Sequence, residues 1–542
     1  MIPIIDIFAG PGGLGEGFSS LLHENKERVF KIKLSIEKDS HAHQTLKLRS
    51  FFRAFRVGCV PEEYYKFVRG EMTLEDLYKT YPEEAASADK EAWCGTLGKP
   101  DKEDKNWLSN DMIDSKIKEV LSGYSNWVLI GGPPCQAYSL VGRSRRKEKI
   151  LDERKDNRVG LYKEYLRIIA VHKPSIFVME NVKGLLSAQT ADDNLFTKIL
   201  NDLTNPVEAS LSEGDITDGN IPRIKYKIYS LVTKVNKFDI FQNPIFKPSD
   251  FVIRTEEYGV PQRRHRVILL GVREDIKGTI GTLEKKSELS LESVIGGLPC
   301  IRSGISKSIS HTSTIGAQTG TVKKRRFYEK VKDSYETWYS HIQNFNNQVT
   351  TILGYSSNNE NIGPLSIGRE FISTEKYSLS NEHPLRKWYY DKKLGGLIHH
   401  VSRTHLLEDI KRYHFACCFV EKYGKFPKLD DFKKAGNEFL PDHENAESGK
   451  FIDRFRVQLP NIPATTITSH ISKDGHYFIH YDSKQSRSFT VREAARVQTF
   501  PDNYYFCGGR TQQFHQVGNA VPPYLAYQIA QIVKNILLDE NE

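Results

Sequence analysis

The sequence Gly131-Gly132-Pro133-Pro134-Cys135-Gln136-Ala137-Tyr138-Ser139 follows directly on the apolar run of residues 127–130. Proline fixes φ and removes a backbone donor, so Pro133 and Pro134 cannot continue a central strand. The chain therefore leaves the predicted sheet here and presents Cys135 at the sheet edge. A thiol on a rigid turn at the carboxyl end of a strand is a candidate nucleophile. A lone cysteine is more often a packing residue, so this interpretation depends on partners.

A second strand-like run ends in a carboxylate at the equivalent place. Residues 175–179 are apolar, as in a buried parallel strand, and Glu180-Asn181-Val182 follows. Between the two runs, residues 161–172 carry apolar side chains at helical spacing. A strand, a helix and a strand form a right-handed crossover. We therefore expect Cys135 and Glu180 to lie at the same edge of one sheet.

A third apolar run, residues 267–272, is preceded by Gln262-Arg263-Arg264-His265-Arg266. Taken singly, Glu180 would be explained as a helix cap, and Arg264 and Arg266 as a solvated basic face. A thiol, a carboxylate and guanidinium groups placed together at sheet edges are not explained by separate structural needs. The combination predicts one crevice in which these groups converge.

The amino-terminal sequence predicts a binding site at the same kind of place. Residues 2–8 form a strand-like run, and Gly10, Gly12 and Gly15 satisfy the pattern G-x-G-x-x-G before a helix. Glu37 closes the next strand-like run, as in dinucleotide-binding proteins, where an acid binds a ribose. A ribose-bearing cofactor without phosphate would use the same geometry. A nicotinamide-dependent oxidoreductase is an alternative, but it leaves Cys135 and the basic residues unexplained.

The motifs in this order resemble those of the DNA (cytosine-5) methyltransferases of bacterial restriction-modification systems. They frame about half of the chain, and their order makes the resemblance far more specific than the glycine loop alone. The matching residues are Asp6-x-Phe8-x-Gly10-x-Gly12-Gly13, Pro133-Pro134-Cys135-Gln136-x-x-Ser139, Glu180-Asn181-Val182, Gln262-x-Arg264-x-Arg266, the run from Thr490 to Pro501, and Gly518-Asn519-Ala520-Val521-Pro522-Pro523.

The resemblance implies a DNA (cytosine-5-)-methyltransferase that uses S-adenosyl-L-methionine and a flipped cytosine in a short DNA sequence. Cys135 would attack C6 of the base, which makes C5 nucleophilic toward the methyl group. A free thiol has a pKa of about 8.5, so neighbouring cations must favour the thiolate, and Arg264 and Arg266 are the candidates. The protonated form of Glu180 would donate to N3 of the base.

The same resemblance implies a set of cofactor contacts. Glu37 would accept hydrogen bonds from both ribose hydroxyls. An acidic residue near the adenine is harder to place, and we prefer Asp111 to Asp114. The remaining expected contacts are Phe8, Gly10, Gly12, Gly13, Leu14, Pro134, Leu161, Asn519 and Val521.

Charge placement indicates a polyanionic partner. The formal net charge is +9, and residues 141–155 carry seven basic residues against three acids, directly after the predicted nucleophile. Such a run is usually a solvated face, but this position favours a loop that grips DNA phosphates around an extruded base. The expected contacts to double-stranded DNA are Ser139, Arg143, Arg145 and Gln262, and the basic residues 323–326 are a weaker candidate.

A chain of 542 residues predicts two domains. We expect an α/β, Rossmann-like methyltransferase domain with a mixed sheet over residues 1–275, with an insertion at about 51–105, helical in part over residues 62–81. Residues 276–487 are expected to form a separate α+β target-recognition domain, including a helix over residues 405–423. Residues 465–470 and 476–480 flank Lys473-Asp474-Gly475 and predict a hairpin.

The last segment, residues 488–542, is expected to return and complete the catalytic domain. Thr490-Val491-Arg492-Glu493 is a capping box that predicts a helix over residues 491–498. Pro522 and Pro523 open a final helix with an apolar packing face.

The remaining features exclude several classes of protein. Seven cysteines without C-x-x-C pairing indicate a reduced compartment, and Cys417 and Cys418 are expected in the core. His399, His400 and His405 lack further ligands at metal spacing, so we expect no metal. The sequence shows no signal peptide and no membrane span, so we expect a location in the bacterial cytoplasm. We also expect a monomer, with a cognate restriction endonuclease as a further partner. An RNA cytosine-5 methyltransferase and a non-catalytic DNA-binding regulator remain alternatives.

Overall fold

A computed structural model describes residues 1–98, 103–134, 161–188, 195–212, 214–216, 221–315, 323–357, 363–440 and 455–538. Its centre is a mixed sheet with the strand order β3-β2-β1-β4-β5-β9-β6, in which β7 also pairs with β9. The first five strands are parallel, and β9 runs antiparallel to both β5 and β6. The predicted mixed α/β sheet is therefore confirmed. The strands are β1 (Ile2–Ile7), β2 (Phe30–Glu37), β3 (Ala92–Cys94), β4 (Val128–Gly131), β5 (Ile176–Val182), β6 (Tyr226–Tyr229), β7 (Val252–Arg254) and β9 (His265–Arg273).

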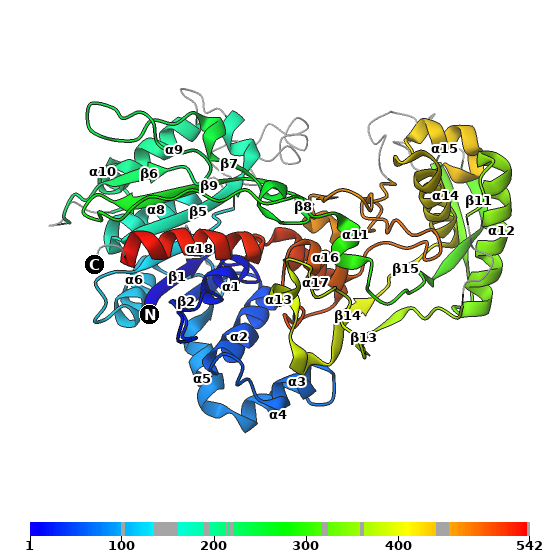
Figure 1. The fold of residues 1–542 in the computed structure, drawn as a ribbon, viewed down its shortest axis with the longest axis horizontal. Helices are drawn as coiled ribbons and strands as arrows, with labels where there is room; N and C mark the ends of the chain where they lie inside the picture. The colour runs from blue at the N-terminus through cyan, green and yellow to red at the C-terminus, as the bar shows by residue number, and fades with distance from the viewer. Residues whose placement is uncertain are drawn as a thin grey trace.

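Successive side chains of each strand point to opposite faces of the sheet, and helices cover both faces. Ile4, Val128 and Val178 pack in one cluster with helices α1 (Gly13–Ser19) and α18 (Pro523–Leu538). Their neighbours Ile5 and Leu129 pack in a second cluster on the other face. That face is covered by α6 (Asn110–Val120), α8 (Leu161–His172), α9 (Leu195–Thr204) and α10 (Pro206–Ser212). Figure 1 shows α18 lying along the sheet beside β1 and α1.

The insertion after the second strand is a helical layer. It follows α2 (Ser40–Ala54), and its helices are α3 (Glu62–Val68), α4 (Leu74–Thr80) and α5 (Pro82–Glu91). The predicted helical content of residues 62–81 is confirmed. Tyr65 donates a hydrogen bond to Asp391 (2.6 Å), and Nζ of Lys393 donates one to the carbonyl of Val60 (2.8 Å). These hydrogen bonds hold residues 391–393 against the insertion.

Residues 276–487 combine helices and short two-stranded sheets. The predicted helix over residues 405–423 is confirmed as α14 (Leu407–Tyr423), in which Cys417 and Cys418 are fully buried, as expected. The domain boundaries at residues 275 and 488 remain predictions. The other elements are α11 (Leu291–Ile295), β10 (Gly304–Ile305), β11 (Lys307–Ile315), β12 (Lys323–Lys330), α12 (Tyr335–Leu353), β13 (Gly368–Ser373), α13 (Arg386–Tyr389), β14 (Gly396–Val401), β15 (Thr404–His405) and α15 (Leu429–Ala435).

The predicted hairpin around Gly475 is wrong. Gly475 does make a turn, with φ of 75°. Its flanks do not pair with each other, because β16 (Ala464–Thr465) pairs in parallel with β8 (Gln262–Arg263), and Ile479 bridges to Val457 and Ser488. The two segments that flank the turn therefore pair with segments far away in the sequence and not with each other.

The final segment forms α16 (Val491–Val497), α17 (Arg510–Asn519) and α18. The capping box is confirmed, since the Thr490 side chain accepts from the backbone N–H of Glu493 and the Glu493 carboxylate accepts from that of Thr490. A Cβ on Gly17 of α1 would stand 2.4 Å from Cβ of Ala526 in α18. Only glycine permits this approach, which closes the last helix onto the first.

Candidate active site

The carboxyl edge of the sheet holds an ion pair between Glu180 of β5 and Arg266 of β9. Nε of Arg266 lies 2.8 Å from Oε1 of Glu180, and each side chain keeps only 14% of its surface exposed. Burial lowers the pKa of Arg266, and the attraction of Glu180 opposes this shift. The antiparallel register places Arg266 opposite Val182, two residues beyond Glu180 on the same face. The sheet topology thus brings two of the predicted catalytic residues into contact.

The segment that leads to Cys135 rests on this pair. Cys135 lies outside the described residues, but Gly132 to Pro134 are described. A Cβ on Gly132 would stand 3.0 Å from Oε2 of Glu180, so the backbone lies directly against the carboxylate. Nδ2 of Asn181, which is buried, donates to the carbonyl of Pro133 (3.4 Å). Asn181 thereby ties the segment that leads to Cys135 to the end of β5.

Arg264 does not reach Glu180, although the sequence predicted it beside Arg266. Its side chain is 2% exposed, and Nη1 donates to the carbonyls of Ile467 (2.7 Å) and Gly518 (3.2 Å). Burial, assisted by repulsion from Arg266, lowers the pKa of Arg264 well below its usual range. Arg264 therefore joins the sheet to the segments before and after α16.

Gln262 also has a structural position. Its side chain is fully buried; Nε2 donates to Oε1 of Gln498 (2.6 Å), and Oε1 accepts from the backbone N–H of Ile467 (2.6 Å). The predicted DNA contact is at odds with this position, because a side chain without exposed surface cannot reach a duplex. The other predicted DNA contacts, Ser139, Arg143 and Arg145, lie outside the described residues.

The glycine loop and Glu37 build a second part of the site at the ends of β1 and β2. Oε2 of Glu37 accepts a hydrogen bond from the backbone N–H of Gly10 (2.7 Å), and Oε1 accepts one from that of Asp39 (2.8 Å). Burial raises the pKa of Glu37. Phe8, which is not glycine, holds a left-handed φ of 56°, a strained conformation that is typical of ligand sites. Apart from Gly10 and its two chain neighbours, no atom of the described residues lies within 4 Å of the place where a Cβ on Gly10 would stand.

The carboxy-terminal segment closes the other side of the glycine loop. A Cβ on Gly13 would stand 2.2 Å from the carbonyl oxygen of Val521, so the start of α1 packs directly on this segment. Leu14 and Val521 are buried, whereas Asn519 is exposed. The Tyr504 hydroxyl donates to the carbonyl of Pro11. The last motifs therefore lie beside the glycine loop, as their resemblance implied.

Leu161, expected to help close the cofactor pocket, and the two candidate acids for the adenine lie on α8 and α6. Cδ2 of Leu161 lies 2.9 Å from the place of a Cβ on Gly98, in the loop after β3. Asp114 is bound by Nη1 of Arg167 (2.9 Å) and Nε2 of His172 (2.8 Å), so its carboxylate already has two cationic or donor partners. Asp111 is exposed in the first turn of α6, and its assignment to the adenine remains a prediction.

One buried acid in this region received no role from the sequence. Asp6 of β1 is 1% exposed, and burial raises its pKa well above the usual range. Its Oδ2 lies 3.1 Å from the place of a Cβ on Gly15, directly under the glycine loop. The sequence signal for this position is that Asp6 is the only charged residue in the otherwise apolar strand β1.

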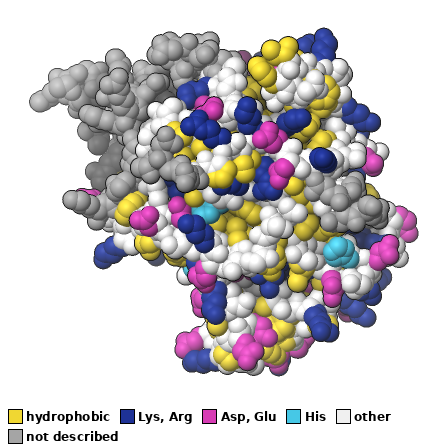
Figure 2. Space-filling view, turned by 90° about the vertical axis from the view of Figure 1, so that its left-hand side faces the viewer, with side chains coloured by type: hydrophobic (Ala, Val, Ile, Leu, Met, Phe, Trp, Pro, Cys, Tyr) yellow, Lys and Arg dark blue, Asp and Glu magenta, His cyan; other side chains and the backbone are white. Residues whose placement is uncertain are grey.

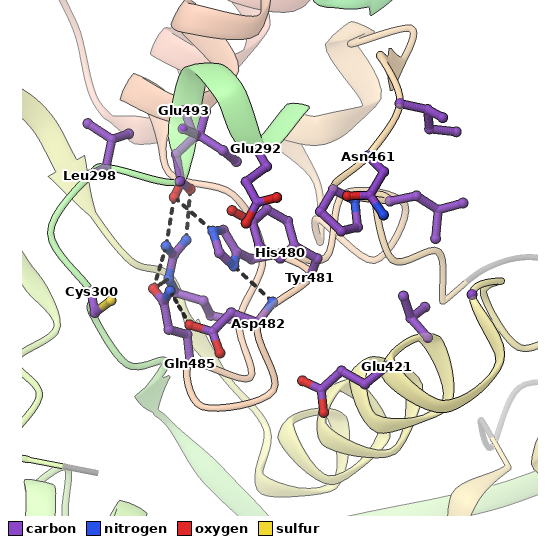
Figure 3. A pocket seen from close by; sticks show the side chains of 18 residues that line it. Glu292, Leu298, Cys300, Glu421, Asn461, His480, Tyr481, Asp482, Gln485 and Glu493 are labelled. Carbon is purple, nitrogen blue, oxygen red and sulfur yellow. Dashed lines mark hydrogen bonds and ion pairs between the residues drawn. The ribbon is translucent and has the colours of Figure 1, made fainter. Parts of the chain in front are cut away.

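A separate cavity of about 600 Å³ lies between α11, α16 and α14 and contains none of the predicted site residues. Figure 3 shows His480 and Glu493 close together at its wall, with Glu292, Glu421 and Asp482 around it. Arg487 pairs with Glu493 at 2.7 Å, and burial lowers the pKa of His480 to about 4. This wall is a packed ionic network that joins α16 to the preceding loop.

Two further features bear on the kind of site. Among the described residues, no group of three His, Cys, Asp or Glu side chains could hold a metal ion. His399, His400 and His405 have separate partners, which include Glu370, Thr490 and Ser488. In the described part of the chain, every helix is too short or too polar to cross a membrane.

The comparisons with known proteins agree with the motifs. The family model of the C-5 cytosine-specific DNA methylases matches residues 104–206 and 233–535. The type II methyltransferase M.Bpa9945I of Bacillus paralicheniformis is 30% identical over 98% of this chain and 99% of its own length. M.DdeI, a type II methyltransferase of Desulfomicrobium norvegicum, is 23% identical over 99% of this chain and 91% of its own. The DNA (cytosine-5-)-methyltransferase M.ApeKI of Aeropyrum pernix is 27% identical over 77% of this chain and 83% of its own. The resemblance seen in the motifs is thus confirmed, and the chain belongs to the C-5 cytosine-specific DNA methylases.

Proposed function

We propose that this DNA methylase transfers a methyl group from S-adenosyl-L-methionine to C5 of a flipped cytosine in a short, specific DNA sequence, through a covalent adduct between Cys135 and C6. The observation that carries the proposal is the Glu180–Arg266 pair against Gly132, three residues before Cys135. A carboxyl group, a guanidinium and the approach to a thiol meet there at one sheet edge. This combination suits a cytosine whose C6 is attacked by the thiolate while its N3 is held and protonated by the carboxyl group.

The chemistry assigns each group a task. The thiolate of Cys135 forms a bond to C6, and the electron pair of the C5–C6 double bond moves toward C5. Glu180 holds N3 and donates a proton there, which makes C6 more electrophilic. Arg266 fixes the Glu180 carboxyl group and adds positive charge near the thiolate, which favours the ionised sulfur. Loss of the C5 proton to water, breakage of the sulfur–C6 bond and return of the N3 proton to Glu180 then restore the neutral aromatic base and free Cys135.

When bound, S-adenosyl-L-methionine supplies the methyl group that C5 takes up. The carboxylate of Glu37 lies at the end of β2, where it would accept the ribose hydroxyls, and the open space beside Gly10 leaves room for a ligand. Asp111 would lie on the adenine side. The other residues that would hold the cofactor are Phe8, Gly12, Gly13, Leu14, Pro134, Leu161, Asn519 and Val521.

Double-stranded DNA is the proposed substrate, with Ser139, Arg143 and Arg145 as contacts near the extruded base. Two of the relatives are named type II methyltransferases, a class that belongs to restriction-modification systems. We therefore propose that the methyl mark protects a short site from a cognate endonuclease. Bisulfite sequencing of DNA from cells that express the protein would identify the methylated sequence.

The covalent route is tested with a duplex that carries 5-fluorocytosine at the target. No C5 proton can then be eliminated, so the wild-type protein should remain attached to the DNA in denaturing gels. Cys135→Ala should form no adduct and transfer no methyl group, while it binds the cofactor with nearly unchanged affinity. Methyl transfer by Cys135→Ala would disprove the adduct, and transfer to RNA in place of DNA would favour the alternative substrate.

A further inference from the structure

The glycine loop between β1 and α1 is held by a side chain from the other end of the chain. The hydroxyl of Tyr504, in the segment between α16 and α17, donates a hydrogen bond to the carbonyl of Pro11. The same hydroxyl lies 3.1 Å from the place where a Cβ on Gly12 would stand. Tyr504 has no exposed surface, and Pro11 is buried as well. Loss of the hydroxyl would therefore leave a carbonyl in the protein interior without this donor.

The contact with the Pro11 carbonyl also orients the rest of the loop. A peptide unit is planar, so the direction of this carbonyl fixes the direction of the N–H of Gly12. That N–H donates to the carbonyl of Ala9 (3.0 Å) and closes a turn. Gly10 lies inside the turn, and its own N–H donates to Oε2 of Glu37 (2.7 Å). A hydrogen bond behind the turn thus determines the backbone that faces the carboxylate.

The loop needs such a contact because its backbone is unusual. Phe8, Gly10 and Gly12 hold left-handed φ angles of 56°, 57° and 87°. The glycines adopt these angles without strain but can adopt many others, and Phe8 is strained. A loop of this kind keeps one conformation only where its surroundings impose it. The hydroxyl of Tyr504 is one part of the surroundings that does so.

Tyr504 is itself held in place on several sides. The centroid of its ring lies 4.7 Å from that of Phe500 and 5.3 Å from that of Phe506. The guanidinium of Arg49 lies 4.9 Å from the centroid of the same ring. Nη2 of Arg492 donates to the backbone carbonyl of Tyr504 (3.0 Å). Burial raises the pKa of Tyr504, so the hydroxyl keeps its proton and remains a donor at neutral pH.

A buried ion pair fixes the first turn of α1 beside this ring. Nε and Nη2 of Arg49 donate to Oε2 and Oε1 of Glu16 at 2.9 and 2.5 Å. Figure 2 shows acidic and basic side chains spread over the outer surface of one face, whereas Glu16 and Arg49 are only 2% and 5% exposed. A buried pair with two hydrogen bonds keeps its geometry better than an exposed pair does. Arg49 therefore holds α1 and the ring of Tyr504 in a fixed relation.

We propose that Tyr504 is a positioning residue for S-adenosyl-L-methionine, whose hydroxyl holds the glycine loop in its binding conformation before the cofactor arrives. The inference rests on the proposed function, because it needs the cofactor beside Gly10 and Glu37. Tyr504 acts through Pro11 and does not itself touch the cofactor. A preformed site loses less conformational entropy when it binds its ligand, so the hydroxyl should increase cofactor affinity.

The test compares two variants that each lose one buried hydroxyl. Tyr504→Phe keeps the ring and its packing and removes only the donor to Pro11. Tyr64→Phe is the matched control, because Tyr64 is also without exposed surface and its hydroxyl donates to the carbonyl of Asn503 (3.3 Å), outside the glycine loop. Circular dichroism and Tm report folding, and calorimetric titration measures the affinity for S-adenosyl-L-methionine.

Tyr504→Phe should bind S-adenosyl-L-methionine about tenfold more weakly than wild type, and Tyr64→Phe should bind it as wild type does, although both lose some Tm. With saturating cofactor and DNA, the single-turnover rate of Tyr504→Phe should stay within about threefold of wild type, since the hydroxyl acts on binding and not on the chemical step. In the protein without cofactor, amide hydrogens of residues 9–13 should exchange faster in Tyr504→Phe than in wild type or Tyr64→Phe.

Unchanged cofactor affinity or unchanged amide exchange in Tyr504→Phe would overturn the inference. Equal losses of affinity in both variants would overturn it too, because the effect would then belong to the packing of this region. Loss of the folded state in Tyr504→Phe would show that the hydroxyl serves the fold as a whole, against the inference. A wild type that binds no S-adenosyl-L-methionine would refute the proposed function and this inference together. A wild type that binds it no better than Tyr504→Phe would refute the inference alone.

Discussion

Glu180 and Arg266 lie on neighbouring antiparallel strands with Oε1 and Nε 2.8 Å apart, and Gly132, at the end of β4, packs on the same carboxylate. The contact joins residues that are 86 positions apart in the chain (266 − 180). It is produced by the insertion of β9 between β5 and β6, which turns the amino end of β9 toward the carboxyl end of β5.

Glu180→Gln should slow methyl transfer in a single turnover by at least about 100-fold at saturating DNA. The amide keeps the size of the side chain but cannot supply a proton to N3. Binding of the duplex, measured by anisotropy, should change by less than about threefold. A single-turnover rate equal to that of wild type would exclude Glu180 from the chemical step.

Arg266→Gln and Arg264→Gln should fail in different ways. Arg266 contacts the Glu180 carboxylate, so its loss should lower the single-turnover rate by about 100-fold with a small change in Tm. Arg264 binds the carbonyls of Ile467 and Gly518 inside the protein, so its loss should lower stability by about 1–3 kcal/mol. Tm and single-turnover rate measured for both variants check this division. Equal loss of Tm in the two variants would contradict it.

Glu37→Gln should weaken cofactor binding by about 10- to 100-fold, because a carboxylate accepts hydrogen bonds from two hydroxyls more strongly than an amide does. Calorimetric titration with S-adenosyl-L-methionine measures the affinity. Glu24→Gln, at an exposed glutamate between α1 and β2, is the matched control and should bind normally. Unchanged affinity in Glu37→Gln would place the ribose elsewhere.

Gln262→Ala should destabilise the protein without changing its target sequence. The substitution leaves Oε1 of Gln498 and the N–H of Ile467 without their buried partner, which costs about 1–3 kcal/mol. Urea denaturation measures the loss, and bisulfite sequencing in cells reports the target. A stable variant with altered sequence preference would show that Gln262 reads DNA after all.

Stability should fall as the pH decreases from about 6.5 toward 4. Burial lowers the pKa of both His400 and His414 to about 4, so in this window the unfolded chain binds protons that the folded protein does not. Protonation therefore favours unfolding, each histidine contributing up to about 1 kcal/mol per pH unit. The midpoint of urea unfolding measured between pH 7.5 and 5 checks the slope, and His414→Gln should make it shallower. A midpoint that does not move over this range would contradict the expectation.

Local sequence determined a large part of the fold. Apolar runs, the capping box at Thr490 and the prolines before α18 specify strands and helices through short-range sterics and hydrogen bonds. The predicted hairpin around Gly475 is an example of pairing that local sequence did not predict correctly. The turn formed as its glycine predicts, but its flanks paired with β8 and with residues 457 and 488, because distant strands offered partners that no local pattern reveals.

The residue types of the candidate active site could be named from the sequence alone, because the motifs place a cysteine, a glutamate and a pair of arginines at strand ends. Tertiary structure alone decided which arginine meets Glu180, and it placed Gln262 and Arg264 inside the protein. In the sequence motif, Arg264 and Arg266 are equally good candidates for the contact with Glu180. They differ once β9 is aligned with β5, since one then faces a carboxylate across the strands and the other meets backbone carbonyls from residues 467 and 518.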